Sequence, residues 1–275
     1  MHAGRFVCTA ILLAVALPAL SSCLQATPFG TEPDERDLNA TNLEALRAVR
    51  TMVPRFVAVA DSHAAFDELA ELGDAVARRP DVHLVVHAGD VTDTGLLWEF
   101  EWSARALERS HKPTFVALGN HDTLSSGREI YRKLYGPFDF SFSWSGVKWI
   151  FFNSNGLDFD DSVPDRQWLA NELASRAPRQ PTVLVTHRPL QHSEDPGGTV
   201  DSFYAELLSR HPVTLLIHGH LEEFRYYRSY GTPAIQCSSF DKTGLHVIVT
   251  LGAQLLVERC RGDQCDRAVM EERDS

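Results

Sequence analysis

The sequence predicts an α/β protein, and two observations support this fold class. In the first half of the chain, short apolar runs alternate with longer segments of helical periodicity, which is typical of parallel strands joined by helical crossovers. In the last third, apolar and polar residues alternate, which indicates antiparallel strands. The chain has 275 residues, 44% hydrophobic and 23% charged, enough for one large α/β domain or two small ones.

The first half of the chain predicts a β-α-β-α-β unit. A helical segment over residues 43–49 precedes this unit and is expected to cover a sheet edge. The predicted strands are 55–60, 82–86 and 114–118, and the helices between them are 66–79 and 96–109. The first of these helices has Leu69, Leu72 and Val76 at helical spacing and ends before Pro80. Such a unit implies parallel strands with right-handed crossovers.

The second half combines a hairpin, two helices and several strands. Residues 140–154 alternate around a Ser145-Gly146 turn, which predicts the hairpin. The other predicted elements are helices 164–176 and 200–210 and strands 181–186, 213–217, 224–229, 234–239, 245–251 and 254–260. Gly231 and Gly252 mark turns. We therefore predict one domain over residues 51–265, followed by a charged tail over residues 266–275 that is expected to fray.

The amino end has the features of an export signal. A weakly basic start precedes an apolar stretch, residues 6–20, which is too short to span a membrane comfortably. Leu20-Ser21-Ser22-Cys23 follows and resembles the lipobox of bacterial lipoproteins. We predict a lipoprotein signal peptide over residues 1–22, acylation of Cys23, and a tether with an amino-terminal helix over residues 23–50. A plain secretory signal with a cysteine near its cleavage site is the alternative.

This signal sets the expected location and partners. The protein is expected to be exported and anchored through lipidated Cys23 to a membrane of the cell envelope, facing the periplasm or the exterior. The formal net charge is −11, so a nucleic-acid partner is not expected. An acidic chain still accepts an anionic substrate where bound cations reverse the local field.

An oxidising compartment also shapes the expectation for the cysteines. Cys260 and Cys265 flank Gly262-Asp263, which permits a turn, so we predict a small-loop disulfide. A zinc site is less favoured because no second pair of Cys or His lies nearby. Cys237 is expected to be a buried free thiol.

Five short blocks of potential metal ligands follow predicted strands. They are Asp61-Ser62-His63, Gly89-Asp90-Val91-Thr92-Asp93, Gly119-Asn120-His121-Asp122, Thr186-His187 and His218-Gly219-His220-Leu221-Glu222. The carboxyl ends of parallel strands converge on one crevice, so these side chains are expected to meet. Any single block is weak evidence, since such short motifs also occur in turns. Five in order, each at a strand end, predict a metal centre.

The ligand types suggest the kind of metal and its arrangement. We expect Asp61 and His63 to point to the same side of an extended chain and to reach one ion. Carboxylate and imidazole ligands suit Mn²⁺, Fe or Zn²⁺ better than Ca²⁺. Asp90 is the natural bridge between two ions, because each of its oxygens can bind one of them. Asn120, His187 and His220 add a neutral oxygen and two imidazoles.

The ordered blocks resemble the calcineurin-like metallophosphoesterase family. The family pattern is Asp-x-His, Gly-Asp-x-x-Asp, Gly-Asn-His-Asp/Glu, a lone His and Gly-His-x-His, and the resemblance runs from about residue 55 to 222. It implies a four-layer αββα sandwich of two mixed sheets flanked by helices. It also implies two divalent ions, the first held by Asp61, His63 and Asp90 and the second by Asp90, Asn120, His187 and His220.

The resemblance assigns chemistry to the neighbouring residues. His121 would contact the phosphoryl group and protonate the leaving oxygen, while a metal-activated hydroxide attacks in line. Asp122 would orient His121 through its ring N–H. Asp93 is expected to be a structural acceptor in the turn. The implied activity is hydrolysis of a phosphodiester or phosphomonoester, with a small organic phosphate as the substrate.

One position departs from the family pattern, because Glu222 stands where the family has its last histidine. That histidine is a ligand of the first metal. Either Glu222 coordinates and favours harder ions such as Mn²⁺ or Mg²⁺, or it points away and leaves the first metal weakly held. The second alternative keeps another class open, a degenerate phosphate-ligand-binding protein with an impaired first metal site. A dinuclear hydrolase of other chemistry, such as an amidase, is a third possibility.

Overall fold

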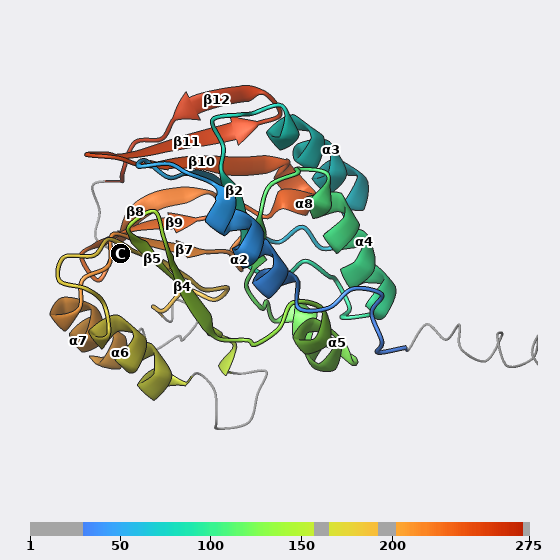
Figure 1. The fold of residues 1–275 in the computed structure, drawn as a ribbon, viewed down its shortest axis with the longest axis horizontal. Coiled ribbons are helices and arrows are strands. Elements are labelled where there is room, and N and C mark those ends of the chain that lie inside the picture. Colours follow the sequence, from blue (N-terminus) through green and yellow to red (C-terminus); the bar gives the residue numbers. More distant parts are fainter. Residues whose placement is uncertain (1–29, 157–164, 192–201, 272–275) are drawn as a thin grey trace, which may run out of the picture.

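The computed structural model describes residues 30–156, 165–191 and 202–271. The predicted signal peptide and Cys23 lie outside these residues. Two six-stranded sheets pack face to face, and helices cover their outer faces (Figure 1). The predicted four-layer sandwich is confirmed. No helix among the described residues is both long and apolar enough to cross a membrane.

The first sheet contains the strands of the amino-terminal β-α-β-α-β unit. Its strand order is β12-β11-β10-β1-β2-β3, with β1, β2 and β3 parallel and β10 antiparallel to β1. The bounds are β1 Arg55–Val59, β2 Leu84–His87, β3 Thr114–Val116, β10 Leu245–Leu251, β11 Leu255–Arg261 and β12 Gln264–Arg267. The parallel strands therefore end at one edge, where three of the five ligand blocks begin.

The second sheet supplies the other two blocks. Its order is β4-β5-β6-β7-β9-β8, in which β5, β6, β7 and β9 are parallel and β4 and β8 are antiparallel edge strands. The bounds are β4 Phe140–Trp144, β5 Val147–Phe151, β6 Thr182–Val185, β7 Leu215–His218, β8 Arg225–Ser229 and β9 Thr232–Gln236. Thr186-His187 follows β6, and Gly219-His220 follows β7.

Alternation along the strands explains the layers. In β1, Phe56 and Ala58 face the core between the two sheets, whereas Val57 and Val59 face the helices outside. Both sets are fully buried, as expected for a parallel strand covered on both faces. Phe56 packs edge-on against Trp149 of the opposite sheet, with ring centroids 5.0 Å apart. This packing fixes one sheet against the other and so fixes the relative positions of the ligand blocks.

Helices cover the outer face of each sheet. Side chains of α3 (Phe66–Ala77), α4 (Leu97–Glu108) and α5 (Gly127–Leu134) join the core outside the first sheet. Side chains of α6 (Arg166–Ala174) and α7 (Ser202–Arg210) do the same for the second. Two short helices, η1 (His121–Thr123) and α8 (Phe240–Thr243), follow strand ends.

The amino-terminal helix α2 (Leu38–Ala48) closes the edge of the first sheet beside β3. The side chain of Asn39 donates to the carbonyl of Val116 at 3.4 Å and accepts from its N–H at 3.2 Å. It thus replaces the neighbouring strand that β3 lacks. The helix was expected over residues 43–49 and begins five residues earlier.

The carboxyl-terminal region is more ordered than predicted. A disulfide joins Cys260 to Cys265 across β11 and β12, and Cys237 is a buried free cysteine. The expected tail from residue 266 begins inside β12, and the N–H of Glu271 donates to Tyr226 at 2.8 Å. The expectation of a frayed tail is therefore wrong up to residue 271. Charged residues that alternate with others can still pair as an edge strand.

Candidate metal centre

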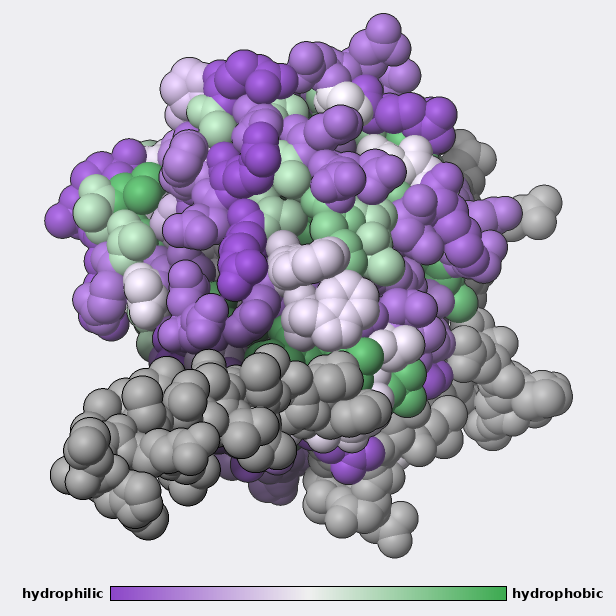
Figure 2. Space-filling view, turned by 90° about the vertical axis from the view of Figure 1, so that its right-hand side faces the viewer, coloured by the Kyte–Doolittle hydropathy of each residue, from purple (hydrophilic) through white to green (hydrophobic). Residues whose placement is uncertain are grey.

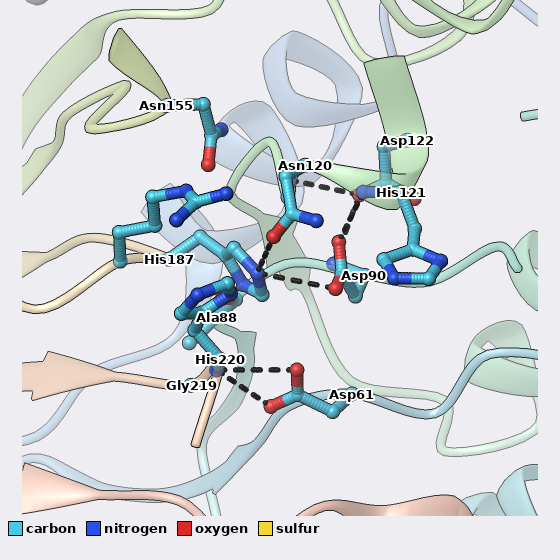
Figure 3. A network of polar contacts seen from close by, with 12 residues as sticks. Asp61, Ala88, Asp90, Asn120, His121, Asp122, Asn155, His187, Gly219 and His220 are labelled. Carbon is cyan, nitrogen blue, oxygen red and sulfur yellow. Dashed lines mark hydrogen bonds and ion pairs between the residues drawn. The ribbon is translucent and has the colours of Figure 1, made fainter. Parts of the chain in front are cut away.

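The structure gathers the ligand blocks at the edge where the parallel strands of both sheets end. Figure 3 shows Asp61, Asp90, Asn120, His187 and His220 around one polar crevice, with His121 at its side. Among the described residues there are two groups of three potential ligands, and within each group the ligand atoms lie within 4.8 Å of one another. They are Asp61, Asp90 and His187, and His63, Asp90 and His121. Asp90 belongs to both groups.

Several ligand residues have left-handed backbone conformations. The φ angles are 54° at Asp61, 43° at His63, 56° at Asp90 and 70° at His220. Such angles are uncommon for residues with side chains and cluster at functional sites. They also correct the expectation that Asp61 and His63 form an extended pair, since the chain turns at both residues. As a result, Asp61 and His63 fall into different ligand groups.

Two glycines allow the loops to approach the carboxylates closely. A Cβ added at Gly119 would lie 2.1 Å from Asp90 Oδ1, and one at Gly219 would lie 2.5 Å from Asp61 Oδ2. Any side chain at these positions would displace a candidate ligand. The glycines that precede Asn120 and His220 in their blocks are therefore required for close packing around the site.

The ligand group of Asp61, Asp90 and His187 is buried. His187 Nε2 lies 3.1 Å from Asp90 Oδ2, and Asp61 accepts the N–H of His220 at 3.0 Å. Burial raises the pKa of Asp61 to about 7, and repulsion from Asp90 adds to the effect while His187 opposes it. Burial alone would also raise the pKa of Asp90, but the pairing with His187 outweighs it and lowers that pKa. Neighbouring buried carboxylates favour a bound cation.

The ring of His187 is fixed in the orientation that a ligand needs. Its Nδ1 donates to the carbonyl of Ala88 at 2.9 Å, which leaves Nε2 toward Asp90 and toward Asn120 Oδ1, 2.9 Å away. Burial alone would lower the pKa of His187, but Asp90 raises it to about 9. The ring of His220 packs edge-on against that of His187, with centroids 5.2 Å apart. The four residues expected at the second metal therefore lie together.

The second ligand group is more exposed and includes His121. The rings of His63 and His121 are edge-to-face, with centroids 4.7 Å apart, and the N–H of His121 donates to Asp90 Oδ1 at 2.8 Å. The Nδ1 of His121 donates to the carbonyl of Asp93 at 2.8 Å. The Asp93 carboxylate lies 3.5 Å from the same nitrogen. The other ring nitrogen of His121 is thereby left for the crevice.

Asp122 has a different position from the one expected. Its carboxylate is fully buried and accepts the backbone N–H groups of Asp90, Thr92 and Gly119 at 2.9–3.0 Å. It therefore ties the second and third ligand blocks together and does not orient the ring of His121. Burial raises its pKa, and repulsion from Asp90 acts in the same direction. Asp93, expected to be a turn acceptor only, is the residue that holds His121.

Glu222 does not join either ligand group. Its carboxylate pairs with Lys242, and its side chain is 72% exposed. Its backbone carbonyl accepts from Ser238 and Ser239, which holds the turn after His220. Of the two alternatives for Glu222, the structure matches the one in which the side chain points away. In this structure Glu222 is therefore not placed as a ligand of the first metal.

The donor set fits a pair of divalent metal ions. It combines two carboxylates, one carboxamide oxygen and several imidazoles, which suit Mn²⁺, Fe and Zn²⁺. The sharing of Asp90 between two groups is what a pair of ions about 3.5–4 Å apart requires. The backbone partner of His187 is typical of metal-binding histidines.

The fold and this cluster of candidate metal ligands agree with the match of the sequence to a family model. Residues 54–222 match the calcineurin-like phosphoesterase family, which is more than half of the chain. The chain belongs to this family. A comparison with curated proteins gave no significant match.

Solved structures with the same fold have low sequence identity to this chain. A purple acid phosphatase from yellow lupin (Lupinus luteus) seeds is 15% identical with a TM-score of 0.61, and the match covers 80% of this chain and 53% of that one. A dimetal phosphatase from Danio rerio is 15% identical with a TM-score of 0.61, over 78% and 98% of the two chains. GAP50 of Plasmodium, described as the anchor in the inner membrane complex, is 14% identical with a TM-score of 0.61, over 78% and 86%. The chain thus spans about half of the lupin enzyme.

Proposed function

We propose that this protein hydrolyses the phosphodiester or phosphomonoester bond of a small organic phosphate with the help of two divalent metal ions. The observation that carries the proposal is Asp90, which belongs to two ligand groups while its carboxylate also accepts the backbone N–H of His121. A shared carboxylate with an imidazole beside it is the arrangement that metal-assisted phosphoryl transfer needs. Family membership supports the same reaction class.

The residues divide between two metal positions. In the family's assignment, Asp61, His63 and Asp90 would hold the first ion, and Asp90, Asn120, His187 and His220 would hold the second. Because Asp61 is grouped with His187 and His63 with His121, the first position requires the His63 ring to move toward Asp61 when the ion binds. When bound, such a pair lowers the pKa of water and neutralises the phosphoryl oxygens. The ions would be Mn²⁺, Fe or Zn²⁺, all compatible with these ligands. The positive charge of the bound ions would then offset the repulsion between the buried carboxylates of Asp61 and Asp90.

His121 would deliver the proton to the leaving oxygen. Its Nδ1 proton is held by the carbonyl of Asp93, so Nε2 is the nitrogen that faces the reacting group. The Asp93 carboxylate also lies 3.5 Å from Nδ1, so both groups of Asp93 fix the orientation of the ring. The side chain of His121 is 37% exposed, which leaves it accessible to a substrate.

The proposed reaction is tested with bis-p-nitrophenyl phosphate and added Mn²⁺. We expect turnover by the parent chain and a loss in kcat of roughly 10²–10⁴ in His121→Ala, the usual contribution of a general acid. His211→Ala, at the end of α7 on the helical layer of the second sheet, is the matched control and should retain full activity. Metal content should be measured in all three proteins.

A degenerate phosphate-ligand-binding protein is the alternative, and Glu222 is the observation that favours it, because it leaves the first metal without its last family ligand. The same fold includes two phosphatases and also GAP50, described as an anchor, so fold alone does not decide. Phosphate binding without turnover under any divalent metal would overturn the hydrolase. Equal turnover by the parent and His121→Ala would overturn the assigned role of His121.

We also propose that the mature chain begins at an acylated Cys23 and is held on a membrane of the cell envelope. The support is the apolar stretch of residues 6–20 followed by Leu20-Ser21-Ser22-Cys23. Mass spectrometry of the amino-terminal peptide should show acyl chains on Cys23. An unmodified amino terminus at a different residue would contradict the anchor without affecting the hydrolase.

A further inference from the structure

We propose that an exposed aromatic surface beside the metal centre docks onto a zwitterionic phospholipid bilayer. The aromatic surface consists of Phe66, the first residue of α3, together with Trp98 and Trp102 in the first two turns of α4. It goes beyond the proposed hydrolysis, because docking requires no turnover. It rests on the proposed acylation of Cys23 for its distance from the membrane.

The three rings form one apolar cluster. The Phe66 ring lies 5.9 Å from that of Trp98 and 5.5 Å from that of Trp102, and the two tryptophans lie 5.1 Å apart, all edge-to-face. Trp98 is 37% exposed and Trp102 is 49% exposed. Tryptophan side chains prefer the boundary between water and lipid, because the ring is apolar and the N–H is polar.

The aromatic surface lies on the same edge of the fold as the metal centre. Phe66 follows His63 by three residues, and α4 begins four residues after Asp93. Both helices start where the parallel strands end, so their amino ends carry the rings close to the ligand blocks. Figure 2 looks onto the side covered by these helices and shows pale and green residues gathered at its centre among purple ones.

The chain also leaves the fold beside this surface. The N–H of Asp34 donates to Glu101, which lies between the two tryptophans in sequence, and Asp34 pairs with Arg105 at 3.5 Å. The hydroxyl of Thr31 donates to Glu129 of α5 at 3.0 Å. In Figure 1 the first described residues run along α4 and α5. From Gly30 back to Cys23 is seven residues, at most about 25 Å of extended chain.

The short segment between Cys23 and Gly30 favours a phospholipid bilayer as the partner of the aromatic surface. An acyl anchor on Cys23 would hold Gly30 within about 25 Å of the bilayer, the length of the extended tether, and Asp34 joins this segment to α4. The rings are packed edge-to-face into one surface, which suits a broad apolar boundary better than a single ring of a substrate. Asp67 and Glu68 are exposed beside Phe66, so a zwitterionic bilayer is favoured over an anionic one.

The test uses the mature chain as isolated from membranes and reconstituted into phosphatidylcholine vesicles. Brominated acyl chains quench only those tryptophans that contact the lipid, and the chain has five tryptophans. We expect brominated vesicles to remove part of the emission. That loss should disappear in Trp98→Phe/Trp102→Phe, which keeps the surface apolar but removes its reporters. Trp168→Phe, on α6 over the second sheet, is the matched control and should keep the loss.

A second variant distinguishes the loss of docking from the loss of the fluorescent tryptophans. Trp102→Glu keeps Trp98 as a reporter but places a charge in the surface, so quenching by brominated lipid should fall. Equal quenching in the parent and in Trp98→Phe/Trp102→Phe would overturn the proposal. A second result would also overturn the proposal. In it, brominated vesicles quench no tryptophan, and Trp98→Ala raises the KM for an aryl phosphodiester without changing kcat. The rings would then bind the leaving group of the substrate and not the bilayer.

Discussion

At the scale of single residues, the candidate ligands sit in costly backbone conformations that the surrounding hydrogen bonds maintain. Asp61 and Asp90 both have positive φ angles, and each carboxylate accepts a backbone N–H from the loop that follows another strand. Non-glycine residues in this region cost of order 1–3 kcal/mol each. The strain is therefore offset by contacts between loops, and each ligand depends on a block distant in sequence.

Glu222 gives the first prediction at this scale. Glu222→His would restore the family's last imidazole at the first metal position, so we expect metal affinity to rise by about tenfold or more, as an added ligand or its support typically gives. Glu222→Ala should leave metal content unchanged, because the carboxylate pairs with Lys242. Isothermal titration with Mn²⁺ and metal analysis measure both effects.

The neighbouring Glu223 provides the control for this experiment. Glu223→His adds the same imidazole one residue away and should not change the affinity. A loss of bound metal in Glu222→Ala would contradict the observed position of Glu222. Unchanged metal content and unchanged turnover in Glu222→His would show that the first metal does not depend on this position.

The sequence predicts well which residues come together at the site, and it predicts poorly which hydrogen bonds they make with one another. Block order and strand ends are enough to bring Asp61, Asp90, Asn120, His187 and His220 together, because parallel strands end at one edge. The partner of His121 could not be derived, since Asp93 and Asp122 are both close to it in the blocks. The turn between Gly119 and Asp122 decides between them, and it points Asp122 inward to backbone amides.

At the scale of helices and strands, periodicity predicts the long elements and misses the short ones. The strands of the β-α-β-α-β unit agree with the predicted ranges within a few residues, because each is an apolar run between turn residues. Helix α5 was not predicted, because only Ile130, Tyr131 and Leu134 of its eight residues are apolar and buried. Its other side chains are polar, and Gly127 and Gly136 lie at its two ends.

Strand β10 carries the second prediction. His246 is 5% exposed there, and its Nδ1 has no hydrogen-bond partner among the described residues. Burial lowers its pKa to about 4, and Arg79 acts in the same direction. The unfolded chain therefore takes up the proton first, so this contribution to stability is intact above about pH 6.5 and is lost as the pH falls toward 4. Replacement by the neutral His246→Gln should remove this dependence.

Urea denaturation at several pH values measures the effect. Between pH 7 and pH 5 the parent should lose about 2 kcal/mol of unfolding free energy relative to His246→Gln, from the linkage between pKa and stability. Between pH 7 and pH 8 the difference between the two proteins should stay constant, which is the internal control. A difference that does not change below pH 7 would show that His246 titrates alike in both states.

At the scale of the whole molecule, the candidate metal centre lies where the two sheets meet. Asp61 and Asp90 come from the first sheet, whereas His187 and His220 come from the second. The N–H of His220 bonds to Asp61, and the N–H of Gly219 bonds to the carbonyl of His187. The distances between the candidate ligands therefore depend on the relative position of the two sheets. A metal ion bound by residues of both sheets would stabilise that position.

This position leads to the third prediction, on metal removal. A metal that binds only the folded chain adds about 2.7 kcal/mol at a hundredfold excess over its Kd. For a chain of this size the midpoint of thermal unfolding should rise by roughly 5–10 °C with Mn²⁺ and fall again with EDTA. Differential scanning calorimetry in the two conditions measures the shift.

Asp90→Asn is the control for this measurement, because Asp90 belongs to both ligand groups. The variant should show little or no shift with Mn²⁺. The exposed Asp67→Asn should shift as the parent does. An equal shift in Asp90→Asn would mean that the metal stabilises the fold from acidic groups elsewhere on the surface.

The side chain of Asn39 has a mechanical consequence for an anchored protein. It is bonded to both backbone groups of Val116, and Val116 lies four residues before Asn120. If the amino end is held at a membrane, as proposed, a pull on it would be shared between the contacts of Thr31 and Asp34 with α5 and α4 and, through α2, the Asn39 side chain beside the strand that precedes Asn120 and His121. The hydroxyl of Tyr131 donates a hydrogen bond to the same carbonyl at 2.6 Å and so helps to hold β3 in place. The proposed attachment of the chain would thereby be mechanically connected to the loop that carries Asn120 and His121.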